Sequence, residues 1–382
     1  MNIEKKSKER ERNIMKKIDW GLSYEEIRDD FLSEPESLKK CVDEYFSNDG
    51  KQFFDQVIST LLELDIKRVL FIGNTFNHFS SHISHYVLSK STKPIPFVWQ
   101  ILELSEFFNY FLPQERLEKP HYNSLYIFIS KSGSSRLLVK SIRQLKLLNM
   151  NKKLVWLVSN NRNPPIKDSI GYLFPTYVEE ELVLGTKSFI STILVLYLIS
   201  IALQGINPIN ENTHTALINL FTNLTDYRNN WYKITEEVMD FIGDNYSFFY
   251  FISREPASYA TAAVSALSTM SFTRILSESI SLGLFFHGPF QVLSDDYICF
   301  ILIGDQLNKE SKTLLERLTN QISKKLKSGR VILISNDITC CTNNEHIYTI
   351  QYECNINALS PIFEFNILQY IFLNIAKKRG VI

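Results

Sequence analysis

The sequence has few of the features that would assign the protein to several common classes. Its 382 residues include only five cysteines, and this odd number without C-x-x-C spacing predicts neither a zinc site nor a disulfide framework. We interpret the adjacent pair Cys340 and Cys341 as incidental rather than redox-active. The 41 basic and 41 acidic residues cancel, which argues against a nucleic-acid surface but leaves room for a local basic pocket. We therefore expect a small-molecule ligand, with no metal and no cofactor.

We also expect neither an export signal nor a membrane-spanning segment. Its first residues, MNIEKKSKERERNIMKK, are too charged for a signal peptide. The longest apolar run, residues 189–203, is shorter than the roughly 20 residues that span a bilayer, so we expect a buried core helix there. These features favour a cytoplasmic protein with no membrane partner and no nucleic-acid partner.

What the sequence does contain is a series of apolar strands that alternate with helix-length segments. We expect strands at 68–73, 95–99, 125–130, 153–159 and 172–176, and again at 248–253, 297–304, 330–335 and 347–352. Strands without polar alternation indicate parallel sheets that are covered on both faces. The chain is about two domains long by the usual prior of roughly 150 residues each. The fold class is therefore predicted as α/β, with two tandem three-layer αβα domains: a charged lead-in at 1–30, a first domain at 31–207 and a second at 208–382.

A run of small polar residues follows the most apolar of these strands. The segment IFISKSGSSR (127–136) places four serines and Lys131 after the strand, and a helix begins at once. Ligands bind beyond the carboxyl ends of parallel strands, and a turn made flexible by Gly133 can direct amides and hydroxyls at one anion beside a helix N-terminus. A helix cap explains one such serine but not four. We therefore predict a phosphate-binding loop, which is not a P-loop because G-x-x-x-x-G-K-[ST] is absent.

The same loop resembles the phosphate loop of the sugar isomerase (SIS) family, whose pattern is roughly S-x-S-G-x-T. Five further segments match family motifs in the same order: SEPESLKK (33–40), FIGNTFNH (71–78), LSEFFNY (104–110), EELVLGTKSF (180–189) and FFHGPFQVLSDD (285–296). The resemblance covers about residues 30–380 and both tandem domains. It is to the branch that holds the isomerase half of glutamine-fructose-6-phosphate aminotransferase and the fructosamine-6-phosphate deglycases, and FFHGPF looks most like the deglycases.

The resemblance implies a set of site residues. The sugar phosphate would be held by Ser130, Lys131, Ser132, Ser135, Asn74 and Thr75, with Gly185 where a ligand-binding serine is usual. His287 would open the sugar ring or transfer a proton, and the family commonly supplies this histidine across a dimer interface. A His before Gly-Pro also lies on a constrained turn, so a structural turn histidine is the alternative. The resemblance thus implies a homodimer or larger homo-oligomer that binds a small sugar phosphate.

The sequence departs from the family where the catalytic base is expected. The family glutamate lies sixteen positions before the histidine; 287 minus 16 is 271, and this chain has Ser271 there, with Ser268 in place of a lysine. A serine is not a competent base unless another group activates it. Glu278 matches another family glutamate and is the first candidate base, with a structural acid as the alternative, and Glu255 is a weaker candidate.

Two functions from different classes remain open at this stage. The chain is either a deglycase or ketose–aldose isomerase acting on a 6-phosphorylated sugar or sugar–amine adduct, or a phosphosugar-binding sensor or partner subunit without turnover. The family favours the enzyme, whereas Ser271 favours the silent binder.

Overall fold

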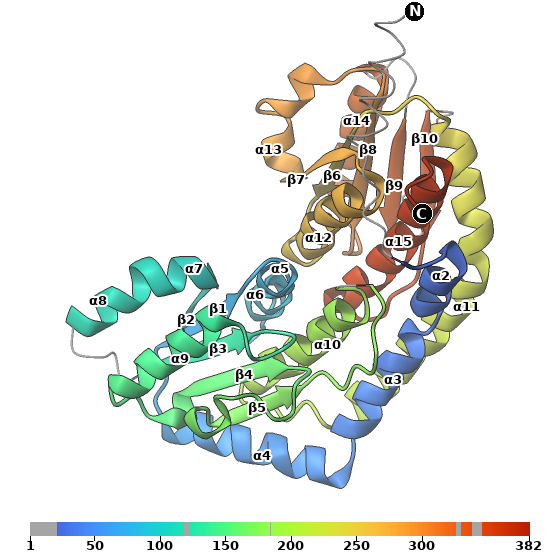
Figure 1. Cartoon of the computed structure of the whole chain (residues 1–382). Helices are drawn as coiled ribbons and strands as arrows, with labels where there is room; N and C mark the ends of the chain where they lie inside the picture. Colours follow the sequence, from blue (N-terminus) through green and yellow to red (C-terminus); the bar gives the residue numbers. More distant parts are fainter. Residues whose placement is uncertain (1–20, 118–122, 184, 326–329, 338–345) are drawn as a thin grey trace, which may run out of the picture.

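The computed structural model of this chain describes residues 21–117, 123–183, 185–325, 330–337 and 346–382 (Figure 1). Most of the predicted lead-in and the pair Cys340 and Cys341 lie outside these residues.

The strands form two sheets of five parallel strands, as the fold-class prediction requires. The first has the order β2-β1-β3-β4-β5 and the second β10-β9-β8-β6-β7. The strands are β1 Arg68–Gly73, β2 Val98–Glu103, β3 Ser124–Ile129, β4 Val155–Ser159, β5 Tyr172–Pro175, β6 Phe248–Ser253, β7 Leu276–Ser281, β8 Tyr297–Ile303, β9 Val331–Ser335 and β10 Ile347–Gln351. When the second sheet is followed from β7, its order repeats that of the first sheet. The two halves of the chain therefore share one topology.

The predicted strands are confirmed where they are buried, and the differences lie at the sheet edges. Every residue of β3 and β4 is buried, which is why these segments read as continuous apolar runs. The edge strand β2 begins at Val98 instead of residue 95, because Pro94 and Pro96 lack the N–H that a ladder needs. The sequence analysis did not predict β7, an edge strand of the second sheet, because its sequence LSESIS is mostly polar and only partly buried.

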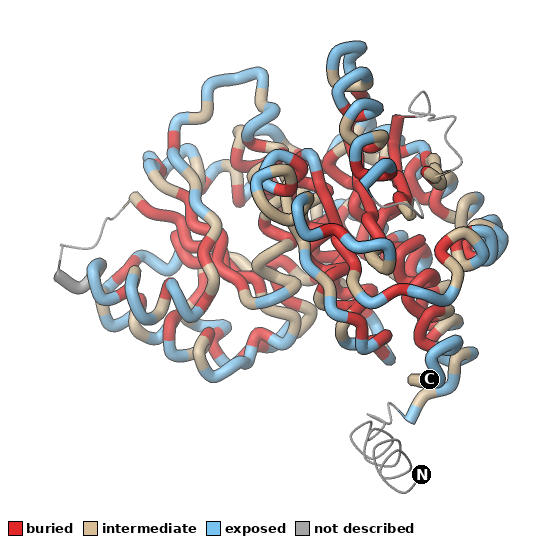
Figure 2. Tube along the Cα trace, turned by 90° about the horizontal axis from the view of Figure 1, so that it is seen from above, coloured by how far each residue is buried: buried red, intermediate tan, exposed pale blue. Residues whose placement is uncertain are grey.

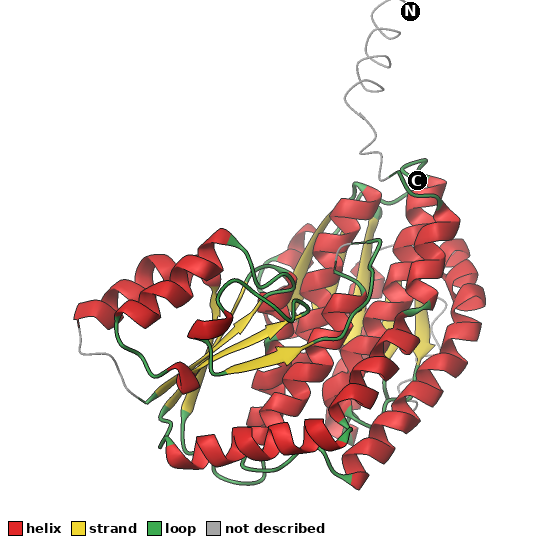
Figure 3. Cartoon of the chain, turned by 60° about the horizontal axis from the view of Figure 1, so that its bottom comes forward, coloured by secondary structure: helices red, strands yellow, loops and turns green. Residues whose placement is uncertain are grey.

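Helices cover both faces of each sheet, and Figure 3 shows them on either side of the first sheet. They are α2 Tyr24–Leu32, α3 Glu34–Tyr45, α4 Asn48–Glu63, α5 Phe76–Ser80, α6 His82–Ser89, α7 Leu104–Glu106, α8 Leu112–Leu117, α9 Arg136–Leu147, α10 Lys187–Ala202, α11 Glu211–Ile242, α12 Pro256–Thr273, α13 Leu282–Phe285, α14 Lys309–Lys325 and α15 Ser360–Lys378. A π-helical turn, Phe107–Phe111, links α7 to α8. The predicted three-layer architecture is thus confirmed.

Two apolar helices, α10 and α15, lie toward the middle of the molecule in Figure 1, and Figure 2 shows that the chain in the interior is mostly buried. Helix α10 coincides with the predicted core helix at 189–203, and nearly all of its residues are buried. Among the described residues one helical stretch, Asn357–Lys378, is long and apolar enough to cross a membrane, and 94% of its apolar window is buried inside the protein. That stretch contains α15, which packs against α11 and α12. The apolar side chains of this stretch are therefore buried in the core, in contact with other helices of the protein.

Candidate functional site

The loop that connects β3 to α9 forms a tight turn around Gly133. The Ser130 N–H donates to the Val158 carbonyl at 2.9 Å, and the Gly133 N–H donates to the Ser130 carbonyl at 3.2 Å. Gly133 has φ +59, and a Cβ atom there would lie 3.0 Å from both Pro164 Cβ and Ser159 Oγ. A glycine is required at this position because a side chain would meet both a strained backbone and close neighbours.

The serines of this loop combine capping with exposure. Ser135 is the N-cap of α9, and its Oγ accepts a 3.4 Å hydrogen bond from the Leu138 N–H. Ser132 Oγ accepts from the Ser134 N–H at 3.3 Å. Both Ser132 and Ser135 are exposed. The cap interpretation therefore holds for Ser135, while the first-turn amides of α9, which have no partners within the helix, stay beside exposed hydroxyls.

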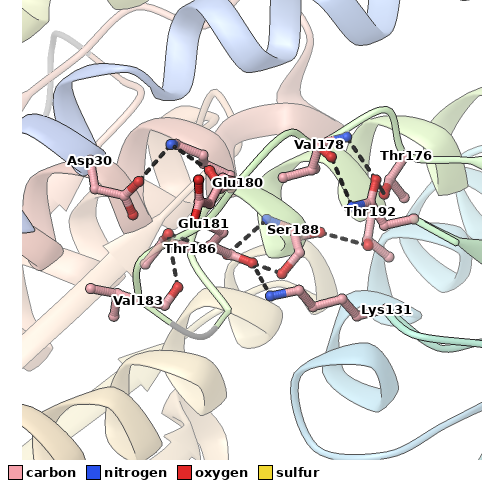
Figure 4. Close-up of polar contacts among 12 residues, drawn as sticks. Asp30, Lys131, Thr176, Val178, Glu180, Glu181, Val183, Thr186, Ser188 and Thr192 are labelled. Carbon is pink, nitrogen blue, oxygen red and sulfur yellow. Dashed lines mark hydrogen bonds and ion pairs between the residues drawn. The ribbon is translucent and has the colours of Figure 1, made fainter. Parts of the chain in front are cut away.

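Lys131 is the basic residue of the loop, and a buried carboxylate holds it (Figure 4). Its Nζ forms an ion pair with Glu181 Oε2, and the Glu181 side chain is only 1% exposed. Glu181 Oε1 in turn accepts from the Ser188 N–H and Oγ, each at 3.1 Å, and from Thr186 Oγ1 at 3.3 Å. One carboxylate thus caps the start of α10 and positions the lysine. Sequence reasoning missed Glu181, although an acid just before a helix is a common capping signal.

A second lysine in the same region faces a different partner. Lys187 Nζ lies 2.6 Å from Asp30 Oδ1 and donates to the Glu180 carbonyl at 3.2 Å. The Lys187 and Asp30 side chains are 10% and 3% exposed. This pair joins α2 to α10 inside the protein and is a structural connection.

The structural repeat between the two halves extends to a Ser-Asn pair beside each loop, Ser159-Asn160 in the first half and Ser335-Asn336 in the second. Asn160, after β4, donates its N–H to the Lys131 carbonyl at 3.0 Å and its side-chain amide to the Val178 carbonyl at 2.8 Å. Asn336, after β9, donates in the same way to the carbonyls of Ile303 at 2.9 Å and Cys354 at 3.0 Å. The loop after β8 is therefore the second-half counterpart of the loop after β3.

The loop after β8 differs from the loop after β3 because its backbone N–H groups donate hydrogen bonds to carboxylates of the protein itself. The N–H groups of Gly304 and Asp305 donate to Glu255 Oε1, the latter at 3.1 Å. The Leu307 N–H donates to Asp337 Oδ2 at 2.8 Å. Burial, with Asp305 nearby, raises the pKa of Glu255 to about 7. Glu255, one of the proposed bases, lies two residues after the end of β6, just as Thr75 lies two residues after the end of β1. Its carboxylate accepts hydrogen bonds from the N–H groups of the loop after β8, so these groups already have a partner within the protein.

A cavity of about 520 Å³ lies between the first-half loop and α12. Its walls include four residues that the sequence singled out, Thr75, Lys131, Gly185 and Ser271, and Ser268 lies beside them. The other described lining residues are Phe76, Asn77, Ser188, Phe189, Leu267, Met270 and Phe272. The structure therefore brings Lys131 to the same space as Ser268 and Ser271, the two positions where the family resemblance implies a lysine and a glutamate.

The remaining predicted site residues lie outside that lining. Ser130, Ser132 and Ser135 are on the adjoining loop, and the Oδ1 atom of Asn74, at the end of β1, is buried. His287 is exposed on the turn after α13, where its N–H donates to the Leu284 carbonyl at 2.9 Å.

Glu278, the first candidate base, is exposed on β7, where it pairs in register with Tyr250. Figure 1 shows β7 and α13 next to each other on the second half of the molecule, away from α9. Within one chain, neither Glu278 nor His287 is among the described residues that line the cavity.

A second cavity of about 520 Å³ lies between α6 and β2 on one side and β6 and β7 on the other. Its lining includes His82, His85, Arg254 and Tyr259. Burial, with His78 and His85 nearby, lowers the pKa of His82 to about 4, so this side chain is neutral at pH 7. The described residues contain no group of three or more His, Cys, Asp or Glu side chains that could hold a metal ion.

Sequence comparison finds curated relatives with one activity. The chain is 22% identical over 365 residues to glutamine–fructose-6-phosphate aminotransferase (isomerizing) of Thermotoga maritima, covering 94% of this chain and 56% of that protein. It is 23% identical over 335 residues to the enzyme with the same name from Tropheryma whipplei, covering 85% of this chain and 51% of that protein. The chain thus spans about half the length of the curated relatives it matches. No protein-family model matches the sequence.

Solved structures share the fold over almost the whole chain. The C-terminal domain of glucosamine-fructose-6-phosphate aminotransferase from Francisella tularensis aligns with a TM-score of 0.74 and 16% identity, covering 94% of this chain and 96% of that one. Tagatose-6-phosphate ketose/aldose isomerase from Escherichia coli aligns with a TM-score of 0.70 and 14% identity, covering 94% and 93%. At these identities the comparison establishes a common fold.

Proposed function

We propose that this chain, which shares its fold with the C-terminal domain of glucosamine-fructose-6-phosphate aminotransferase, is a sugar isomerase (SIS) protein with two tandem domains and binds a 6-phosphorylated sugar at residues 130–135. We propose further that it acts as a ketose–aldose isomerase or a fructosamine-6-phosphate deglycase. The observation that carries this proposal is the difference between the two related loops. The loop after β8 is filled by Glu255, whereas the loop after β3 presents Lys131 to a cavity of ligand size.

The first-half loop offers a phosphate several kinds of donor. Lys131 supplies a positive charge, and the start of α9 supplies amides with a favourable dipole. Each hydrogen bond to a charged oxygen contributes roughly 1.5–3 kcal/mol. The ion pair with Glu181 holds the Lys131 side chain in place in the absence of ligand, and this lowers the entropic cost of ordering that side chain on binding. Because the second loop holds its own carboxylate, we expect one phosphosugar per chain.

The proposed chemistry needs groups that one chain does not bring to the cavity. His287 and Glu278 lie near each other in sequence on the β7–α13 region and are both exposed. A second copy of the chain could therefore present both to the cavity, His287 for ring opening and Glu278 for proton transfer between sugar carbons. In the deglycase reaction, water then cleaves the sugar–amine bond and releases the free amine. A positioned acid or base contributes typically a factor of 10² to 10⁴ to such a rate.

A second candidate function is favoured by the α12 wall of the cavity. Ser268 and Ser271 line it where the family resemblance implies a lysine and a glutamate. Without those groups the site would bind a phosphosugar without turning it over, as a sensor or partner subunit would.

Binding and turnover measured together test both candidates. We expect calorimetric titration to detect fructose 6-phosphate, and we expect Ser132→Asp to abolish this binding by placing a fixed negative charge where the phosphate would lie. Turnover is followed as glucose 6-phosphate or free amine released from fructosamine 6-phosphates. Loss of at least 10² in rate in Glu278→Gln supports the enzyme, whereas an inactive parent that gains activity as Ser271→Glu supports the silent binder. Unchanged affinity in Ser132→Asp contradicts the loop assignment.

A further inference from the structure

The apolar part of the candidate cavity is built around Gly185 and Phe76. Gly185 has φ +89, and a Cβ atom at this position would lie 2.0 Å from Phe76 Cε2 and 2.1 Å from Phe76 Cδ2. The Phe76 ring therefore takes up the space into which a side chain at residue 185 would project. It also contacts Phe189 edge-on, with 6.4 Å between the ring centroids. Residue 185, where the family resemblance implies a ligand-binding serine, therefore has no side chain, and the Phe76 ring lies in that space.

The facing wall continues this apolar surface. Leu267 and Met270 on α12 both line the cavity, and both are only partly buried. Phe76 is likewise partly buried. These three side chains come from two separate helices, α5 and α12, and present hydrocarbon to the same space that receives Lys131.

We propose that the ligand is a sugar phosphate joined to an apolar or aromatic amine, whose hydrocarbon part lies against Phe76, Leu267 and Met270 while its phosphate lies at the loop with Lys131. This inference rests on the proposed function, because it assigns the phosphate to the loop 130–135. The apolar part of the ligand is stabilised because its hydrocarbon surface is removed from water. A charged or strongly polar amine would lose its hydration at this surface without gaining matching hydrogen bonds.

The test compares ligands that share the phosphate and differ in the amine. Titration calorimetry would use fructose 6-phosphate and the fructosamine 6-phosphates formed from phenylalanine, leucine and aspartate. We expect the phenylalanine and leucine adducts to bind at least tenfold more tightly than both fructose 6-phosphate and the aspartate adduct. Equal affinities, or tighter binding of the aspartate adduct, would overturn the inference.

Two variants separate this inference from the proposed function. Phe76→Ala should reduce the preference for the phenylalanine adduct about tenfold while leaving the affinity for fructose 6-phosphate within about twofold. Phe79→Ala, on the same short helix but outside the described cavity lining, is the matched control and should keep the preference. Ser132→Asp should remove binding of all four ligands, which tests the loop alone.

The outcomes of these titrations are distinguishable. If Phe76→Ala weakens all four ligands equally, or changes the sedimentation of the protein instead of its ligand preference, the aromatic ring serves the fold or a contact between copies and the inference fails. If the parent binds none of the four ligands, the proposed function fails as well.

Discussion

Two lysines that are close in space have separate roles at the residue scale. Lys131 faces the cavity and is held by Glu181, whereas Lys187 is buried against Asp30. The sequence does not separate these roles, because both lysines lie in motifs matched to the same family. The structure separates them, since Lys131 lines the cavity whereas the side chains of the Lys187–Asp30 pair are only 10% and 3% exposed and Lys187 is outside the described lining.

We predict that Lys187→Met destabilises the protein by about 3–5 kcal/mol, because it leaves the Asp30 carboxylate buried without its partner. The measurement is equilibrium unfolding in urea. The double variant Asp30→Asn with Lys187→Met removes both charges and should recover most of the loss. A single variant within about 1 kcal/mol of the parent would contradict the structural assignment of this pair.

The structure brings four of the predicted site residues together, and their roles in binding and catalysis stay predictions. Thr75, Lys131, Gly185 and Ser271 do line one cavity. Glu181 could not be assigned, because its contact with Lys131 crosses 50 residues of sequence and depends on the entry into α10. The serines of the loop 130–135 were predicted from a local strand–turn–helix pattern, and their role in binding stays a prediction.

At the scale of elements, α12 and α15 are joined by a buried acidic cluster. Ser258 Oγ donates at 2.6 Å to Glu364 Oε1 and lies 3.1 Å from Glu255 Oε1. Burial is the main cause that raises the pKa of Glu364, and that of Glu255, to about 7. Glu364 Oε1 also accepts from Tyr352 at 3.1 Å. The protonated forms of both acids are therefore favoured by folding.

This cluster predicts a specific dependence of stability on pH. A raised carboxyl pKa means that the folded state binds more protons than the unfolded state between pH 4.5 and about 7, so its stabilising contribution is complete below pH 4.5 and is lost as the pH rises to about 7 and beyond. In Glu364→Gln, which keeps the shape, unfolding free energy in urea should fall less between pH 5 and pH 8 than in the parent. A difference of up to about 3 kcal/mol is expected at pH 8. Parallel pH curves for parent and variant would contradict the assignment.

The sequence predicted the buried strands more accurately than the strands at the sheet edges. The continuous apolar strands β1, β3 and β4 were found almost residue for residue. The strand β7 was missed because an edge strand with partly exposed polar residues has neither an apolar run nor a regular alternation. That edge carries Glu278, so the weakest part of the fold prediction coincides with a candidate catalytic residue.

At the scale of the whole molecule, two halves with the same topology carry different loops. The repeat was visible in the sequence as two series of apolar strands, and the structure confirms it in the strand orders. The sequence could not show that Glu255 fills the second loop, because that contact spans 49 residues between β6 and β8. The predicted domain boundary at 207/208 falls between α10 and α11 and stays a prediction.

If a second copy of the chain brings His287 and Glu278 to the cavity, as we propose, the protein must self-associate. We expect the protein to sediment as a dimer or larger assembly at micromolar concentration, because the cavity of one chain lacks both groups among its described lining residues. Analytical ultracentrifugation over a hundredfold concentration range is the measurement. A monomer with no concentration dependence would contradict this arrangement.

The central claim, that only the first of the two related loops receives a phosphate, is tested most directly by a matched pair of helix-cap variants. Ser135 caps α9 in the first half, and Asn308 Oδ1 accepts from the Ser311 N–H at 2.8 Å at the start of α14 in the second half. Aspartate is a good N-cap, so Ser135→Asp and Asn308→Asp should both fold normally.

Titration calorimetry with fructose 6-phosphate should show at least a hundredfold loss of affinity in Ser135→Asp, because the new charge repels the phosphate. Asn308→Asp should bind like the parent. Parent-like binding in Ser135→Asp, or an equal loss in both variants, would contradict the account.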